Sequence, residues 1–169
     1  MMDKKIIEIL NESINQELLV SEIYSLFEKT FREDSEFWYK LSQEELSHSI
    51  TLQAERDSFS EEGLLPAELV QVDLEKLQKQ NSLLSGFYEG LKKSAPSREQ
   101  AFSIACALER TMLETIYASC LAKHPETRAL KIFQSISSDE KEHIERILQY
   151  ASNTGIKIDE SKKHYPFDA

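Results

Sequence analysis

The sequence predicts an all-α protein made of two antiparallel helix pairs joined by a long crossover. Glycine and proline are scarce, at four residues each among 169, and they lie almost entirely between segments of regular apolar spacing. Within those segments apolar residues recur every three or four positions, which is the period of one face of an α-helix. No strand pattern competes with this period. We therefore expect a single helical domain covering residues 1–169.

The first predicted pair covers about residues 4–30 and about residues 36–58. Asp34 and Ser35, between the two, offer side chains that can cap the second helix. A connection this short requires the helices to run antiparallel. The predicted inner faces mix apolar and ionisable residues: Ile6, Leu10, Ser13, Glu17, Val20, Tyr24, Phe27 and Phe31 in the first helix, and Trp38, Leu41, Glu45, His48 and Leu52 in the second.

A crossover of about residues 60–96 follows, too long for a turn between adjacent helices of a bundle. It must cross the length of the domain, so the helices before and after it run parallel. Between Val72 and Lys93 leucines and a phenylalanine have a weak helical period, which predicts an accessory helix. That helix could cover the site, form a subunit contact or do neither.

The second predicted pair covers about residues 98–123 and about residues 127–153, and we expect the tail, 156–169, to pack loosely. Ser97 and Gln100 form a capping box at the start of the first of these helices. The predicted inner faces are Phe102, Cys106, Glu109, Met112 or Leu113, Ile116 and Cys120 in one helix, and Phe133, Ile136, Glu140, His143 and Ile147 in the other.

Each pair places ionisable residues in the middle of an apolar stripe. Residues three apart share a helix face, so the glutamate and histidine of each Glu-x-x-His can reach one point. Buried carboxylates cost several kcal/mol each unless they are protonated, solvated or bound to cations. Two divalent ions would balance four carboxylates, with two imidazoles completing the sites. The predicted metal ligands are Glu17, Glu45, His48, Glu109, Glu140 and His143.

Oxygen and nitrogen donors without thiolates suit iron or manganese, and zinc competes because affinity rises along the divalent series. Glu22 and Glu114 are rival ligands at similar positions. Their helix faces carry more polar neighbours, which favours Glu17 and Glu109. Either rival could still replace or supplement the favoured residue as a ligand.

Four further residues lie close to the predicted ligands. Tyr24 and Tyr117 are either core aromatics or hydrogen-bond donors to a ligand carboxylate. Glu44 and Asp139 each precede a motif glutamate and stand four residues before a motif histidine. They are either solvent-facing charges or partners of the ligands.

In the strings QELLVSEIY, EELSH, ALERTML and DEKEH the chain resembles the rubrerythrin and ferritin-like superfamily. The resemblance covers all four main helices and implies a ferritin-like four-helix bundle that holds two iron ions. It implies that Glu45 and Glu140 bridge the ions, with no catalytic residue beyond the metal ligands. It also implies an oxidoreductase that reduces peroxide or dioxygen, and association into a homodimer. The alternative is a non-catalytic iron-binding or peroxide-sensing protein.

The chain also departs from that family. Full rubrerythrins carry a rubredoxin module with four cysteines, whereas this chain has only Cys106 and Cys120, so electrons must come from an external donor. No fifth helix is evident after Gly155, which disfavours a storage cage. A purely structural helical protein, with water among its inward acids, is a third hypothesis.

The charge and hydropathy of the chain exclude several partners. The formal net charge is -10 and no basic cluster with interleaved aromatics is present, so we expect no nucleic-acid partner and no membrane partner. No apolar run approaches the roughly 20 residues of a membrane span, and the start of the chain lacks the features of a signal peptide. We expect a cytoplasmic protein.

Overall fold

The computed structural model describes residues 2–62, 67–114, 128–159 and 161. Every regular element within these ranges is helical, so the all-α prediction is confirmed for this part of the chain. The elements are α1 (Met2–Thr30), the short η1 (Arg32–Asp34), α2 (Ser35–Glu62), the short η2 (Ala67–Gln71), α3 (Leu74–Lys93), α4 (Arg98–Met112) and α6 (Arg128–Asn153).

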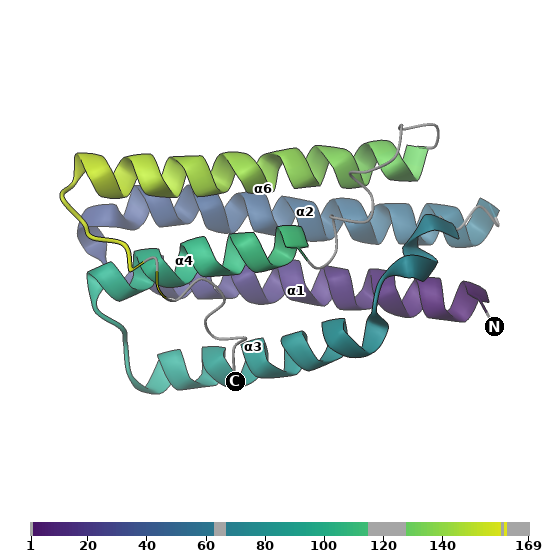
Figure 1. Ribbon diagram of the computed structural model, residues 1–169, viewed down its shortest axis with the longest axis horizontal. Helices are drawn as coiled ribbons and strands as arrows, with labels where there is room; N and C mark the ends of the chain where they lie inside the picture. Colours follow the sequence, from purple (N-terminus) through teal and green to yellow (C-terminus); the bar gives the residue numbers. More distant parts are fainter. Residues whose placement is uncertain (1, 63–66, 115–127, 160, 162–169) are drawn as a thin grey trace.

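Figure 1 shows α1, α2, α4 and α6 side by side along the long axis of the molecule. Helices α1 and α2 run in opposite directions, as do α4 and α6, whereas α2 and α4 run in the same direction. The chain crosses the length of the molecule between α2 and α4, and α3 lies along α1 on that path. None of the described helices is both long and apolar enough to cross a membrane.

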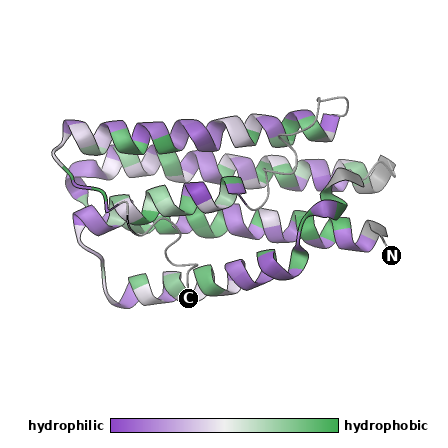
Figure 2. Cartoon of the chain, viewed as in Figure 1, coloured by the Kyte–Doolittle hydropathy of each residue, from purple (hydrophilic) through white to green (hydrophobic). Residues whose placement is uncertain are grey.

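The predicted inner faces are the buried faces of the helices. Of the inner-face residues within the described ranges, all are buried except Phe31 and Leu113, which are half-buried. Hydrophobic and hydrophilic residues intermingle along every helix in Figure 2, as expected when each helix buries one side. Residues 115–123 of the predicted third helix lie outside the described residues, and so do Ile116, Tyr117 and Cys120.

The hydrophobic core consists of two clusters. One contains Val20, Phe27 and Trp38, and the other contains Leu10 and Phe133. Along α1, α2 and α6 the predicted ligands come between residues of one cluster and residues of the other. The acids therefore lie mid-helix between two apolar blocks that exclude water on both sides.

The accessory helix α3 packs against the outside of α1. It begins after Asp73, whose side chain accepts a hydrogen bond from the Lys76 backbone nitrogen at 3.1 Å. Leu77 and Leu84 are buried, and the Asn81 side chain donates to the backbone oxygen of Glu12 at 2.8 Å. Helix α3 carries none of the six predicted ligands.

The expectation of a loosely packed tail is wrong for residues 156–159. Gly155 has a φ of +72°, a left-handed conformation that glycine adopts without strain, and it turns the chain back at the end of α6. Ile156 is then buried in the core, and the Asp159 backbone nitrogen donates to the Ser103 hydroxyl at 2.9 Å. The rest of the tail lies outside the described residues, apart from Ser161.

Asp34 has a different role from the cap predicted for it. Its carboxylate is buried and accepts two hydrogen bonds from the Arg98 guanidinium, at 2.6 and 2.7 Å. The Tyr150 hydroxyl donates to the same carboxylate at 2.9 Å. Asp34 thereby ties the turn between α1 and α2 to the start of α4 and the end of α6.

We expect Asp34→Ala to lower the free energy of unfolding by about 2–4 kcal/mol, because it removes three hydrogen bonds that Arg98 and Tyr150 donate to a buried carboxylate. Urea unfolding followed by circular dichroism measures the change. Asp57→Ala is the control, since Asp57 is exposed and forms an ion pair with the adjacent Arg56; its effect should stay within about 0.5 kcal/mol. Equal effects of the two substitutions would contradict the role of Asp34.

Candidate metal centre

The structure brings the six predicted ligands together from four helices. Helix α1 provides Glu17, α2 provides Glu45 and His48, α4 provides Glu109, and α6 provides the last two. All are buried, and the four glutamates have no exposed surface. The helical period explains the convergence, because each residue continues the apolar stripe of its own helix. The two residues from α6 are Glu140 and His143.

The six side chains form two overlapping groups. In each group, one ligand atom from every member lies within 4.8 Å of the others. Glu45 and Glu140 belong to both groups, and each group has one further glutamate and one histidine. The first group is Glu17, Glu45, His48 and Glu140, and the second is Glu45, Glu109, Glu140 and His143.

Both imidazole rings turn Nδ1 towards the carboxylates. His48 Nδ1 lies 3.3 Å from Glu140 Oε1 and 3.6 Å from Glu45 Oε2. His143 Nδ1 lies 2.7 Å from Glu45 Oε1 and 3.4 Å from Glu109 Oε2. The two rings are nearly parallel, with centroids 5.6 Å apart. Each histidine thus presents a nitrogen donor atom to its own group of carboxylates.

The cluster has unused capacity to bind a cation. Both carboxylate oxygens of Glu45 and of Glu140, and Nδ1 of each histidine, are buried and make no aligned hydrogen bond with the described residues. Native proteins rarely leave buried polar atoms in this state, and a bound ion is one of the accepted explanations. The donor set of carboxylate oxygens and imidazole nitrogens is one that divalent cations accept. The residues present therefore fit a metal centre.

The protonation equilibria of the cluster show the same need for positive charge. Burial raises the pKa of Glu17 to about 8, and burial together with the charges of Glu45 and Glu109 raises the pKa of Glu140 well above its ordinary value. Burial opposes ionisation of Glu45 as well, but the two imidazoles outweigh it and its pKa is lowered. Burial disfavours imidazolium, yet the surrounding carboxylates raise the pKa of both histidines. Without a metal, protons have to supply the positive charge.

The outer nitrogen of each imidazole contacts an acid on the opposite helix. His48 Nε2 lies 3.3 Å from Asp139 Oδ2, and His143 Nε2 lies 3.3 Å from Glu44 Oε2. Arg146 forms a two-point contact with the Glu44 carboxylate. Such contacts fix the ring orientation and place the proton on Nε2, which leaves Nδ1 free to bind a metal. Glu44 and Asp139 could have been solvent-facing charges or partners of the predicted ligands, and the structure supports contact with the histidines.

We expect Asp139→Asn to weaken metal binding by about 10–100-fold, the usual effect of losing such an outer acid. Asp139 is a cleaner target than Glu44, since Glu44 also binds Arg146. Competition against a chromophoric chelator measures the affinity. Asp57→Asn, an exposed acid away from the cluster, should leave the affinity unchanged. An unchanged affinity in the Asp139 variant would mean that its contact with His48 has no bearing on metal binding.

Tyr24 binds one of the predicted ligands. Its hydroxyl donates to Glu109 Oε1 at 2.5 Å, and both side chains are fully buried. The other oxygen of Glu109, Oε2, is the one that faces His143. The hydrogen bond therefore fixes the carboxylate with one oxygen turned towards the cluster. Burial and the neighbouring carboxylates raise the pKa of Tyr24 well above its usual value, so the phenol keeps its proton.

The rival ligands lie elsewhere. Glu22 and Glu114 are exposed, and neither belongs to the two groups. Arg146 was not singled out by sequence reasoning. The sequence feature that could have indicated Arg146 is its position three residues after His143, on the same helix face.

No protein-family model, curated protein or solved structure matches the chain. Its function has to be inferred from the cluster and its surroundings.

A hollow of about 380 Å³ between α2 and α6 leads to the histidine side of the cluster. His48 and His143 line it, together with Asp139, Glu44 and Arg146. A molecule entering the hollow meets charged and hydroxylated side chains before it reaches the imidazoles. The cluster is thus buried but accessible to a small polar molecule.

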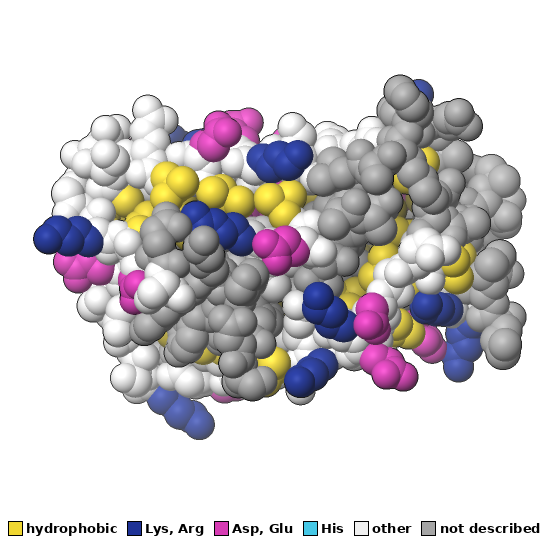
Figure 3. Space-filling model, viewed as in Figure 1, with side chains coloured by type: hydrophobic (Ala, Val, Ile, Leu, Met, Phe, Trp, Pro, Cys, Tyr) yellow, Lys and Arg dark blue, Asp and Glu magenta, His cyan; other side chains and the backbone are white. Residues whose placement is uncertain are grey.

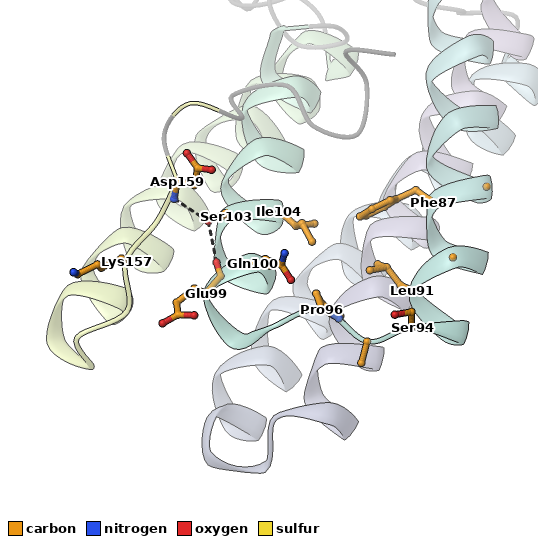
Figure 4. Close-up of a pocket in the computed structure, with 13 residues that line it drawn as sticks. Phe87, Leu91, Ser94, Pro96, Glu99, Gln100, Ser103, Ile104, Lys157 and Asp159 are labelled. Carbon is orange, nitrogen blue, oxygen red and sulfur yellow. Dashed lines mark hydrogen bonds between the residues drawn. The ribbon is translucent and has the colours of Figure 1, made fainter.

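A larger hollow of about 530 Å³ lies apart from the cluster. Figure 4 shows its lining, in which Phe87 and Leu91 of α3 face Gln100 and Ile104 of α4, with Asp159 close by. None of the six predicted ligands lines it. On the face of the molecule drawn in Figure 3, apolar side chains are visible in bands bordered by charged residues.

Proposed function

We propose that the chain is a ferritin-like di-iron carboxylate protein, and that it reduces peroxide or dioxygen with electrons from an external donor. The observation that carries the proposal is the pair of buried ligand groups sharing Glu45 and Glu140. In the family that the sequence resembles, two carboxylates bridge two irons in a bundle with one long crossover. The order of the helices and the cluster both agree with that arrangement.

The choice of iron follows from the donor atoms and the reaction class. The groups offer carboxylate oxygens and imidazole nitrogens, which suit iron or manganese, with zinc as a competitor. The buried Cys106 is in neither group. When bound, two ferrous ions would supply the two electrons that convert peroxide and two protons into two molecules of water.

The residues of the chain would perform four tasks in this reaction. Glu45 and Glu140 would contact both ions and so accommodate a change in their charge. Glu17 and Glu109 would each bind a single ion. The apolar blocks on either side would exclude water, and the hollow between α2 and α6 would admit the small oxidant and its protons.

The proposal is tested by loading the protein with ferrous iron under argon and then adding peroxide. We expect two irons per chain, and peroxide consumption that continues for as long as an electron donor is supplied. A single stoichiometric oxidation without recycling would instead indicate an iron-binding or peroxide-sensing protein. Absence of bound iron, manganese and zinc would support the purely structural hypothesis.

A further inference from the structure

A row of aromatic side chains leads from the cluster towards the surface. It begins at Tyr24, which donates to Glu109 and whose ring centroid lies 5.7 Å from that of Trp38. Trp38 in turn lies 4.5 Å from Phe102 and 5.2 Å from Phe37. Since Trp38 and Phe102 are fully buried, this first part of the row is shielded from water.

The row ends at Tyr150, and two parallel contacts reach it. The Phe37 ring stacks on the Tyr150 ring with centroids 4.2 Å apart, and the Phe102 ring lies parallel to it at 5.6 Å. Tyr150 is half-buried and lines a surface hollow of about 350 Å³ with Lys40 and Asn153. One phenylalanine ring therefore separates the buried tryptophan from a tyrosine that an external molecule can touch.

Three features of this row suit the transfer of single electrons. The tyrosine at each end donates its hydroxyl hydrogen to a carboxylate, Tyr24 to Glu109 and Tyr150 to Asp34. A carboxylate in that position can accept the proton that a phenol loses on oxidation. Between them, the Trp38 indole nitrogen is buried and has no hydrogen-bond partner among the described residues, although buried tryptophans usually have one.

We propose that Tyr24, Trp38 and Tyr150 carry single electrons from the surface to the cluster. The inference rests on the proposed function, because the electrons need a redox-active metal as their destination. Tyr150, at the outer end of the row, is the residue that takes the electron from the external donor. The donor is a one-electron reductant, and it is oxidised by one electron in each transfer.

The transfers balance in electrons and protons. Tyr24 gives one electron to the cluster and its phenol proton to Glu109. It then takes an electron from Trp38 and takes the proton back from Glu109. Trp38 has no acceptor for its N–H proton in the described part of the chain, so it is oxidised to the radical cation and then takes an electron from Tyr150. Tyr150 passes its proton to Asp34, then takes an electron from the donor and the proton back from Asp34. The net result is one electron moved inwards and no proton consumed along the row.

The test uses the metal-free protein with a ruthenium photo-oxidant attached beside Tyr150. Asn153→Cys provides the attachment site in a Cys120→Ser background, since Cys106 is buried. A flash oxidises the row from its outer end, and electron paramagnetic resonance of samples frozen after the flash detects the radicals formed. We expect tyrosyl signals from Tyr150 and Tyr24, and the part of the signal that is lost in Tyr24→Phe is assigned to Tyr24.

Trp38→Phe should abolish the Tyr24 signal while keeping an aromatic ring in the core. The matched control is Phe27→Leu, because Phe27 contacts both Tyr24 and Trp38 but lies off the route to Tyr150. This control should retain the signal. A Tyr24 signal equally strong in Trp38→Phe, or absent from the parent protein, would overturn the proposal. Urea unfolding of each variant shows whether a missing signal reflects loss of electron transfer or loss of the folded state.

The outcome does not depend on the metal. If the chain failed to bind iron, photo-oxidation of Tyr24 through Trp38 would still be observed. If the row did not transfer electrons, the metal content of the Trp38→Phe protein would still equal that of the parent. The two proposals can therefore fail separately.

Discussion

The double variant His48→Ala with His143→Ala is expected to lose both metal ions while keeping its helical fold. Each imidazole supplies the nitrogen donor of one ligand group. Outer partners of metal ligands already contribute about 10–100-fold in affinity, so loss of a ligand itself should weaken binding by more than about a hundredfold at each group. Elemental analysis of the desalted protein, with circular dichroism for the fold, measures the result.

The chain provides a matched control for this experiment. It has four histidines, and the other two are His124 and His164. Neither is among the six predicted ligands, so alanine at both positions removes the same chemical groups and should leave the metal content equal to that of the parent. If the His48 and His143 variant retained as much metal as the control, the assignment of these residues as ligands would be wrong.

The sequence was sufficient to predict which side chains of each helix face the interior, because each helix follows a regular period. On α1 the choice between Glu17 and Glu22 depended only on helical phase, since Glu17 shares its face with Leu10 and Val20. In the structure Glu17 is fully buried and Glu22 is exposed. The same logic separated Glu109 from Glu114. A long, regular amphipathic helix constrains side-chain direction without any knowledge of its partners.

Contacts between helices could not be predicted in this way. The sequence shows Glu44 four residues before His48 on the same helix, but in the structure it contacts His143 of α6, and Asp139 contacts His48. Likewise Asp34 is 64 residues from Arg98, and its position next to a helix start suggested a cap. The pairing depends on how the helices rotate and slide against one another, which no local pattern records. The packing of Ile156 against the core could not be predicted for the same reason, because it too depends on how distant parts of the chain come together.

The acids of the cluster should lower the stability of the metal-free protein, so replacing one of them should raise it. We expect Glu140→Gln to increase the free energy of unfolding in the presence of chelator by about 1–3 kcal/mol at neutral pH, and to abolish the stabilisation that added metal gives the parent protein. Glutamine keeps the size and polarity of the side chain but cannot ionise. Glu142→Gln, an exposed position on the same helix, is the control and should change little.

The sign of the pH dependence follows from the raised pKa of Glu140. Above the ordinary pKa of 4.5 the unfolded chain loses this proton while the folded protein keeps it, so the stability of the parent falls as the pH rises. The glutamine variant lacks this contribution, and its advantage should be small near pH 4.5 and grow towards neutrality. Urea unfolding at acidic and neutral pH measures the difference. A variant less stable than the parent at both values would show that the buried acid stabilises the fold without a cation, which would remove the physical reason for expecting a metal there.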